Sequence, residues 1–133
     1  MIKIKKNTNF SIAIDGDSAS GKTTGSKFIA KYFGFKLLTS GKLYRYVAFR
    51  IIKDNKKKLD KKYLKKITKN ITFKKLQNNK MMYTDDVTSY ASSIAKIKFI
   101  RKLLNKFQKK FSKNKKFIIE GRDIASKILP NAD

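Results

Sequence analysis

Cysteine, histidine and tryptophan are all absent from the 133-residue sequence. Without cysteine, the chain can form neither a disulfide framework nor a thiolate metal site. Without histidine, it lacks both the commonest metal ligand and the usual general base near neutral pH. These absences exclude a disulfide-stabilised fold, a thiolate metal site and any catalytic or metal-binding role for histidine.

Long apolar runs are also absent, because no stretch approaches the roughly 18 to 20 residues that span a bilayer. The first nine residues are basic, but the apolar run at 10–14 is too short for the core of a signal peptide. We therefore expect a cytoplasmic protein with no membrane partner. Because 41% of the residues are hydrophobic and 12% are aromatic, the chain is long and apolar enough to bury the core of one domain.

Acidic residues are few: 9 Asp and Glu stand against 34 Lys and Arg, which gives a formal net charge of +25. Such a charge favours anionic ligands, and a basic RNA-binding protein is one interpretation. However, lysine, asparagine, isoleucine and phenylalanine are all frequent, which is typical of an AT-rich coding sequence. We therefore do not expect nucleic acid to be the specific partner. The four arginines are scarce enough to be examined one by one: Arg45, Arg50, Arg101 and Arg122.

The apolar periodicity predicts strands that alternate with helices. Short apolar runs indicate strands at 10–14, 35–38 and 117–119, and two weak strands between 71 and 83. Helical spacing predicts helices at 22–33, 43–52, within the lysine-rich stretch 53–66, and at 85–111. Gly34 is expected to end the first of these helices. Strands separated by helices favour an α/β fold with a mainly parallel sheet.

A phosphate-binding loop follows the first predicted strand. The pattern G-x-x-x-x-G-K-S/T is complete here, in Gly16-Asp17-Ser18-Ala19-Ser20-Gly21-Lys22-Thr23. Its glycines allow successive backbone N–H groups to point at phosphate oxygens, and Lys22 supplies a cation for the β- and γ-phosphates. The hydroxyl of Thr23 or Thr24 is suited to Mg²⁺. Because the loop joins a strand to a helix, the pattern predicts that residues 16–24 bind ATP.

Three further blocks resemble bacterial cytidylate kinases. The stretch from Thr39 to Arg45 is similar to that family's S/T-G-A-I/L-Y-R, and Ala91-Ser92-Ser93-Ile94-Ala95 with Arg101 is similar to its A-S-x-V/I-A helix. The stretch from Glu120 to Ile124, followed by Pro130-Asn131-Ala132, resembles D/E-G-R-D-I/M and P-D/N-A. Together the blocks cover almost the whole chain. One departure is Tyr83, which stands where the family pattern R-T-x-E-V has arginine.

The resemblance implies a phosphate-loop fold of the nucleoside monophosphate kinase type, with helices flanking a parallel sheet. It implies one partial kinase domain over 1–133, with a core at 10–54 and 112–133. The insert and helix that bind the monophosphate would occupy about 55–111. The family continues beyond its P-D/N-A motif with further strands and a lid, so we expect this chain to be truncated at its C-terminus.

The resemblance also implies the roles of individual residues. Lys22 and Arg122 would be catalytic, and Glu120 would help to hold Mg²⁺, directly or through water. The residues implied to bind the acceptor nucleotide are Ser40, Arg45, Ser92, Arg101, Arg122 and Asp123. Arg45 and Arg122 would grip its phosphate, since the planar guanidinium fork suits phosphate oxygens. Ser92, Arg101 and Asp123 would read the cytosine edge.

The implied reaction transfers the γ-phosphoryl group of ATP to CMP or dCMP in a monomeric enzyme. Such a transfer depends on positioning and charge neutralisation rather than on histidine or cysteine. Two alternatives remain beside the RNA-binding one. The chain is a phosphate-loop kinase for another small acceptor, or a fragment that binds ATP without turnover.

Overall fold

A computed structural model of the chain describes residues 12–15, 30–32, 34–77, 80–111 and 117–121. The chain divides into two compact units. The first, here the sheet unit, comprises Met1–Ser40 and Gln108–Asp133, and the second, here the helical unit, comprises Gly41–Phe107. Within the described residues, no helix is both long and apolar enough to cross a bilayer.

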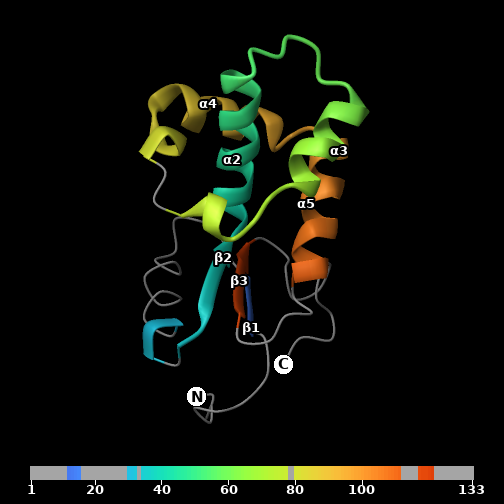
Figure 1. The fold of residues 1–133 in the computed structure, drawn as a ribbon. Helices are drawn as coiled ribbons and strands as arrows, with labels where there is room; N and C mark the ends of the chain where they lie inside the picture. The colour runs from blue at the N-terminus through green and yellow to red at the C-terminus, as the bar shows by residue number, and fades with distance from the viewer. Residues whose placement is uncertain (1–11, 16–29, 33, 78–79, 112–116, 122–133) are drawn as a thin grey trace. The chain divides into compact units, whose positions relative to one another are not determined.

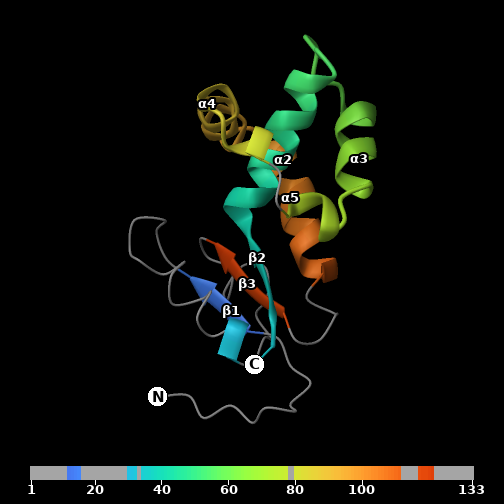
Figure 2. The same ribbon diagram turned by 60° about the vertical axis from the view of Figure 1, so that its left-hand side comes forward.

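The sheet unit contains three parallel strands, β1 (Ile12–Asp15), β2 (Lys36–Thr39) and β3 (Phe117–Gly121). Their order is β1-β3-β2, so the strand that comes last in the sequence lies between the other two, as Figure 1 and Figure 2 show. Leu38 and Ile118 are fully buried. Because neighbouring strands run in the same direction, their carboxyl ends meet at one edge of the sheet.

Gly34 ends a helical turn, as its position in the sequence predicts. Residues 30–32 are helical, and the amide of Phe35 donates a 2.8 Å hydrogen bond to the carbonyl of Ala30. Gly34 has a φ of 70°, in the left-handed region that favours glycine. This bond across five residues, with a left-handed glycine, is the Schellman arrangement that closes helix C-termini. The remainder of the predicted helix at 22–33 lies outside the described residues.

Helix α2 (Ser40–Lys53) starts three residues before the predicted helix at 43–52. The predicted apolar stripe is confirmed at Leu43, Val47 and Ile51, which are buried. Ile52, in contrast, is 44% exposed, because it lies beyond the edge of this stripe. The buried apolar residues of the helical unit are Leu43, Tyr46, Val47, Ala48, Ile51, Leu64, Ile67, Ile71, Leu76, Met82, Val87, Ala91, Ile94, Ile100 and Leu104.

Helix α3 (Lys61–Lys69) begins within the lysine-rich stretch. Asp60 is its N-cap, and its carboxylate accepts a 2.7 Å hydrogen bond from the amide of Tyr63. Leu64 and Ile67 are buried and form the narrow apolar side of this helix. The lysines of this stretch and helix are all exposed, which fits a solvated face.

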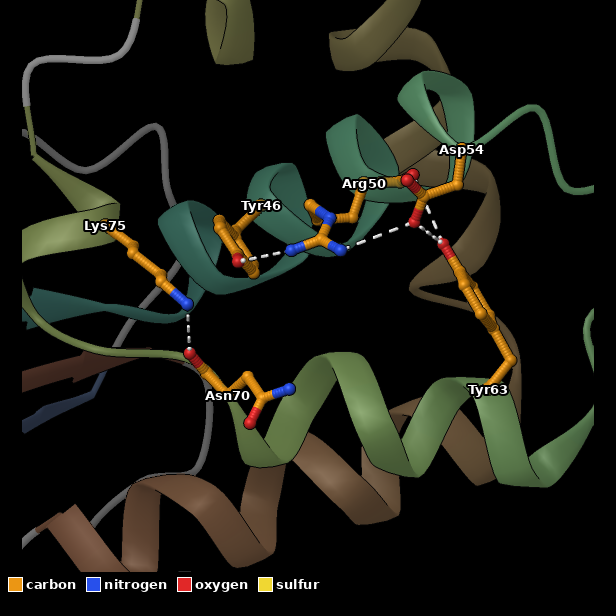
Figure 3. Close-up of polar contacts among 6 residues, drawn as sticks. All are labelled: Tyr46, Arg50, Asp54, Tyr63, Asn70 and Lys75. Carbon is orange, nitrogen blue, oxygen red and sulfur yellow. Dashed lines mark hydrogen bonds and ion pairs between the residues drawn. The ribbon is translucent and has the colours of Figure 1, made fainter.

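Polar contacts join α2 to α3 (Figure 3). Arg50 donates to the hydroxyl of Tyr46 at 3.2 Å and pairs with Asp54 at 3.5 Å. Asp54 also accepts a 2.7 Å hydrogen bond from the hydroxyl of Tyr63 on α3. The Nε atom of Arg50 is buried and has no hydrogen-bond partner in the described part of the chain. Beyond α3, the ammonium of Lys75 donates to the carbonyl of Asn70 at 3.0 Å.

The two weak strands predicted between 71 and 83 are wrong, because this stretch forms two 3₁₀ helices, η1 (Lys74–Leu76) and η2 (Lys80–Tyr83). The hydroxyl of Thr72 accepts a hydrogen bond from the amide of Lys75, and such local bonds favour a turn over an extended strand. One buried apolar residue anchors each turn, Leu76 in η1 and Met82 in η2.

The prediction of a single long helix at 85–111 is also wrong. Two helices are present, α4 (Asp85–Ile94) and α5 (Lys98–Phe111). The buried stripe of α4 ends at Ile94, and helical spacing would continue it at positions 98 and 101, which are lysine and arginine. The stripe of α5 instead starts at Ile100. The chain therefore turns between the helices, and the amide of Ile97 donates to the carbonyl of Ile94 at 3.0 Å.

Candidate nucleotide-binding site

The predicted phosphate loop, Gly16 to Thr24, lies outside the described residues, as do Arg122 and Asp123. The strands on which the loop depends are described. Strand β1 ends at Asp15, directly before Gly16, and strand β3 ends at Gly121, directly before Arg122. Both predicted segments therefore leave the carboxyl edge of the parallel sheet, where α/β proteins bind their ligands.

Two other predicted residues come from this edge. The backbone of Glu120 pairs with Ile14 in β1 and with Thr39 in β2, and Ser40 follows Thr39 directly. The register thus brings Ser40 and Glu120 to the strand ends at which the loop begins.

A magnesium ion fits the chemistry of this edge. Mg²⁺ is bound by one or two carboxylates together with water and substrate phosphates. Glu120 is a carboxylate residue at the end of β3, beside the end of the strand that leads into the phosphate loop. Within the described residues, no three acidic side chains gather into a metal-binding group.

Arg45, the predicted phosphate ligand on α2, is held by two other elements. Its Nη1 atom donates a 2.6 Å hydrogen bond to the hydroxyl of Thr88 on α4 and a 3.4 Å bond to the carbonyl of Met82 in η2. The guanidinium carbon also lies 4.9 Å from the ring centroid of Tyr83. This distance is within the range of a cation–π contact.

Ser92, a predicted cytosine ligand, also contacts Thr88 of α4. Its hydroxyl donates a 3.3 Å hydrogen bond to the carbonyl of Thr88, one turn earlier in the helix. Arg45 and Ser92 therefore both contact Thr88, although 47 positions separate them in the sequence. Ser92 is exposed, so its hydroxyl is also accessible from solvent.

Arg101, the third predicted ligand in the helical unit, lies beside Tyr44, the residue before Arg45. Burial raises the pKa of the Tyr44 hydroxyl, while the charge of Arg101 and a hydrogen bond with Arg101 lower it in part. The structure thus brings Arg101 close to α2, and Arg45 and Ser92 together at Thr88. One cationic side chain suits a phosphate, and a second cation with a hydroxyl suits the polar edge of a base.

Sequence reasoning missed Thr88, Tyr83 and Tyr44. Thr88 precedes Ser92 by four residues, so helical spacing places both on one face of α4. That spacing could have identified Thr88. The contacts of Arg45 with Tyr83 and Met82 depend on the turn at η2, which the sequence did not predict.

Comparison with known proteins identifies the family. A family model described as "Cytidylate kinase" matches residues 12–133. A cytidylate kinase of Fusobacterium nucleatum is 37% identical over 93% of this chain and 61% of its own length. Those of Caldicellulosiruptor bescii and Clostridioides difficile are each 33% identical, over 92% and 94% of this chain and over 60% and 62% of their own lengths.

The chain thus spans about 60% of the length of the curated relatives that it matches. The matched region includes every residue for which the sequence predicts a role in binding or catalysis. The fold implied is that of the phosphate-loop nucleoside monophosphate kinases, and the three parallel strands agree with it. On this evidence the chain belongs to the cytidylate kinase family.

Proposed function

We propose that the protein transfers the γ-phosphoryl group of ATP to CMP or dCMP, giving ADP and CDP or dCDP. The observation that carries the proposal is the family match over residues 12–133. The contacts of the predicted acceptor ligands support it, since Arg45 and Ser92 meet at Thr88 and Arg101 lies beside Tyr44. We further propose that helices flank the parallel sheet and that the protein is a cytoplasmic monomer.

ATP is the co-substrate in this proposal. Residues 16–24 bind its phosphates through backbone N–H groups, and Lys22 neutralises charge at the β- and γ-phosphates. Mg²⁺, when bound, neutralises charge on the same oxygens, and Thr23, Thr24 and Glu120 are the residues proposed to hold it. Asp15, at the end of β1, leads the chain into this loop.

The acceptor nucleotide is held through its phosphate and its base. Arg45 and Arg122 bind the phosphate, with Ser40 as an additional hydroxyl ligand. Ser92 and Arg101 donate to the acceptor atoms of the cytosine edge, and the carboxylate of Asp123 accepts from its exocyclic amine. Because uracil carries a carbonyl in place of that amine, the carboxylate would favour cytosine over uracil.

The chemical step is a direct in-line transfer. An oxygen of the CMP phosphate attacks the γ-phosphorus of ATP, and the bond from this phosphorus to the β–γ bridging oxygen breaks, so that ADP leaves. Lys22 and Arg122 stabilise the charge that develops on the transferred group. The protein supplies positioning and electrostatic stabilisation, for which its arginines, lysines and carboxylates suffice.

A coupled assay of ADP release tests this function. We expect turnover of Mg·ATP with CMP or dCMP that exceeds turnover with UMP, AMP or GMP, and that Lys22→Ala abolishes. Lys31→Ala is the matched control, because it removes the same charge at an exposed position. Turnover with a different acceptor would favour the kinase for another small molecule. ATP binding without turnover would favour the inactive fragment, and a salt-sensitive RNA affinity far above that for CMP would favour the RNA-binding protein.

A further inference from the structure

The geometry around Arg45 points to two residues that prepare it for the acceptor phosphate. Building on the proposed function, we propose that Thr88 and Tyr83 are positioning residues. They hold the Arg45 guanidinium so that one of its edges stays available to a nucleotide monophosphate. Neither residue is a proposed ligand of the nucleotide itself.

Thr88 fixes one corner of the guanidinium. The 2.6 Å bond from Nη1 of Arg45 to the Thr88 hydroxyl is short, as hydrogen bonds from a charged donor commonly are. The same nitrogen also donates to the carbonyl of Met82, at 3.4 Å. Two acceptors from two different elements thus share one terminal nitrogen. This arrangement restricts rotation of the long arginine side chain.

Tyr83 restricts the plane of the group. The guanidinium carbon lies 4.9 Å from its ring centroid, and planar guanidinium groups stack on aromatic faces. The Tyr83 side chain is 52% exposed, so little of its ring contributes to the apolar core. The ring contacts Arg45 instead, which is consistent with a positioning role for this exposed side chain.

The opposite edge of Arg45 remains available. Among the described residues, neither Nη2 nor Nε of Arg45 donates a hydrogen bond, and the side chain is only half-buried. These two nitrogens form a planar pair of donors that matches two oxygens of a phosphate group. Because the anchor occupies Nη1 alone, a phosphate can bind without breaking it. The side chain then loses less rotational freedom when the nucleotide binds.

Thr88 is not needed for the stability of α4. The N-cap of this helix is Thr84, whose hydroxyl accepts a hydrogen bond from the amide of Val87. Thr88 itself is exposed and lies outside the buried stripe of the helix. Replacement of its hydroxyl should therefore alter the setting of Arg45 while leaving the helix folded.

The test compares the affinities for CMP and for cytidine, because their ratio isolates the contribution of the phosphate. Both are measured by titration with the 133-residue chain, by calorimetry for CMP and by NMR shift for cytidine. The variants are Thr88→Val, which keeps the shape but removes the hydroxyl, and Tyr83→Leu, which removes the ring. Two conservative variants are compared with them: Thr88→Ser, which retains the hydroxyl, and Tyr83→Phe, which retains the ring. Ser89→Ala is the matched control, because it removes a neighbouring exposed hydroxyl of α4.

We expect Thr88→Val and Tyr83→Leu each to lower CMP affinity about threefold to tenfold, with cytidine affinity unchanged. Thr88→Ser, Tyr83→Phe and Ser89→Ala should bind both ligands as the unmodified chain does. Thr88→Val should have no further effect on CMP affinity in an Arg45→Ala background, because no guanidinium remains to be held.

Equal CMP affinities for the unmodified chain and Thr88→Val would overturn the inference and leave the proposed function intact. A parallel loss of CMP and cytidine affinity would also overturn it, because that result indicates a general structural role. If the unmodified chain binds no CMP, the proposed function fails, and the inference fails with it.

Discussion

The hydroxyl of Tyr63 on α3 donates a 2.7 Å hydrogen bond to the carboxylate of Asp54, the residue that follows α2. Seven residues, 54–60, lie between the end of α2 at Lys53 and the start of α3 at Lys61. Five of these, 56–60, follow the turn at Asn55, which has a φ of 50°. The contact is therefore a direct side-chain link between two helices that a short loop already connects (Figure 3). Helix α2 carries Arg45, so this link supports the element from which the proposed phosphate ligand extends.

The link from Tyr63 to Asp54 should contribute measurably to stability. Tyr63→Phe removes the hydroxyl and keeps the ring, so we expect the free energy of unfolding to fall by about 1 kcal/mol. Urea denaturation followed by circular dichroism measures this change. Tyr83→Phe is the control, because the Tyr83 hydroxyl makes no hydrogen bond within the described residues and its removal should cost little. Equal effects of the two substitutions would contradict the role of the Tyr63 bond.

The stability that the hydrogen bond from Tyr63 to Asp54 provides should depend on pH. The hydrogen bond from Tyr63 is the main cause that lowers the pKa of Asp54, and Arg50 adds to it. A carboxyl group whose folded pKa is lowered stabilises the protein above its unfolded pKa, about 3.9, and this stabilisation is lost as the pH falls through the folded pKa. The stability difference between the unmodified chain and Tyr63→Phe should thus shrink as the pH falls from 6 to below 3. A difference that stays constant over this range would show that Asp54 titrates independently of Tyr63.

The N-cap of α3 should contribute about 1 kcal/mol to the free energy of unfolding. Asp60→Ala leaves the amide of Tyr63 without its side-chain acceptor, so the free energy of unfolding should fall by about that amount. Asp60→Asn retains an oxygen acceptor and should keep most of the stability. Thermal or urea denaturation of the two variants separates the capping bond from the loss of charge. If Asp60→Asn is as unstable as Asp60→Ala, charge rather than capping is the cause.

Two glycines should respond in opposite ways to alanine. Gly34 has a φ of 70°, and no atom lies within 4 Å of an added Cβ, so Gly34→Ala suffers only from the backbone conformation. We expect the free energy of unfolding to fall by about 1 kcal/mol. Gly41 lies in α2 with equally open space and no positive φ, so Gly41→Ala should stabilise the chain by about 0.5 kcal/mol. Chemical denaturation of both variants tests the pair, and a destabilising Gly41→Ala would contradict the argument.

The helix boundaries show what periodicity can and cannot predict. The stripe of α2 and the stop at Gly34 were predictable, because local spacing and one left-handed residue determine them. The break between α4 and α5 was not predicted, because apolar residues continue along the sequence while the buried stripe changes phase. That phase change depends on which side chains find a partner in the folded chain.

The candidate site shows a similar division. The resemblance of motifs identified Arg45, Ser92 and Arg101 without any geometry. It could not identify Thr88 as the residue that Arg45 and Ser92 share, because that contact joins residues 43 positions apart. Contacts between distant elements depend on tertiary packing. The contacts of Arg45 with Met82 and Tyr83 depend in addition on the turn at η2, where the sequence pattern predicted a strand. The predicted roles of the residues at 16–24, 122 and 123 stay predictions.

One titration can show whether the chain binds a cytidine monophosphate through side chains of its helical unit, as we claim. CMP and UMP are titrated by calorimetry into the unmodified chain, Arg101→Ala and Lys102→Ala. Lys102 is the matched control, because it is the next residue of α5 and is likewise exposed and positively charged. We predict that the unmodified chain and Lys102→Ala bind CMP more tightly than UMP, and that Arg101→Ala weakens CMP binding by about tenfold or more. Equal binding of CMP and UMP, or equal effects of the two substitutions, would contradict the claim.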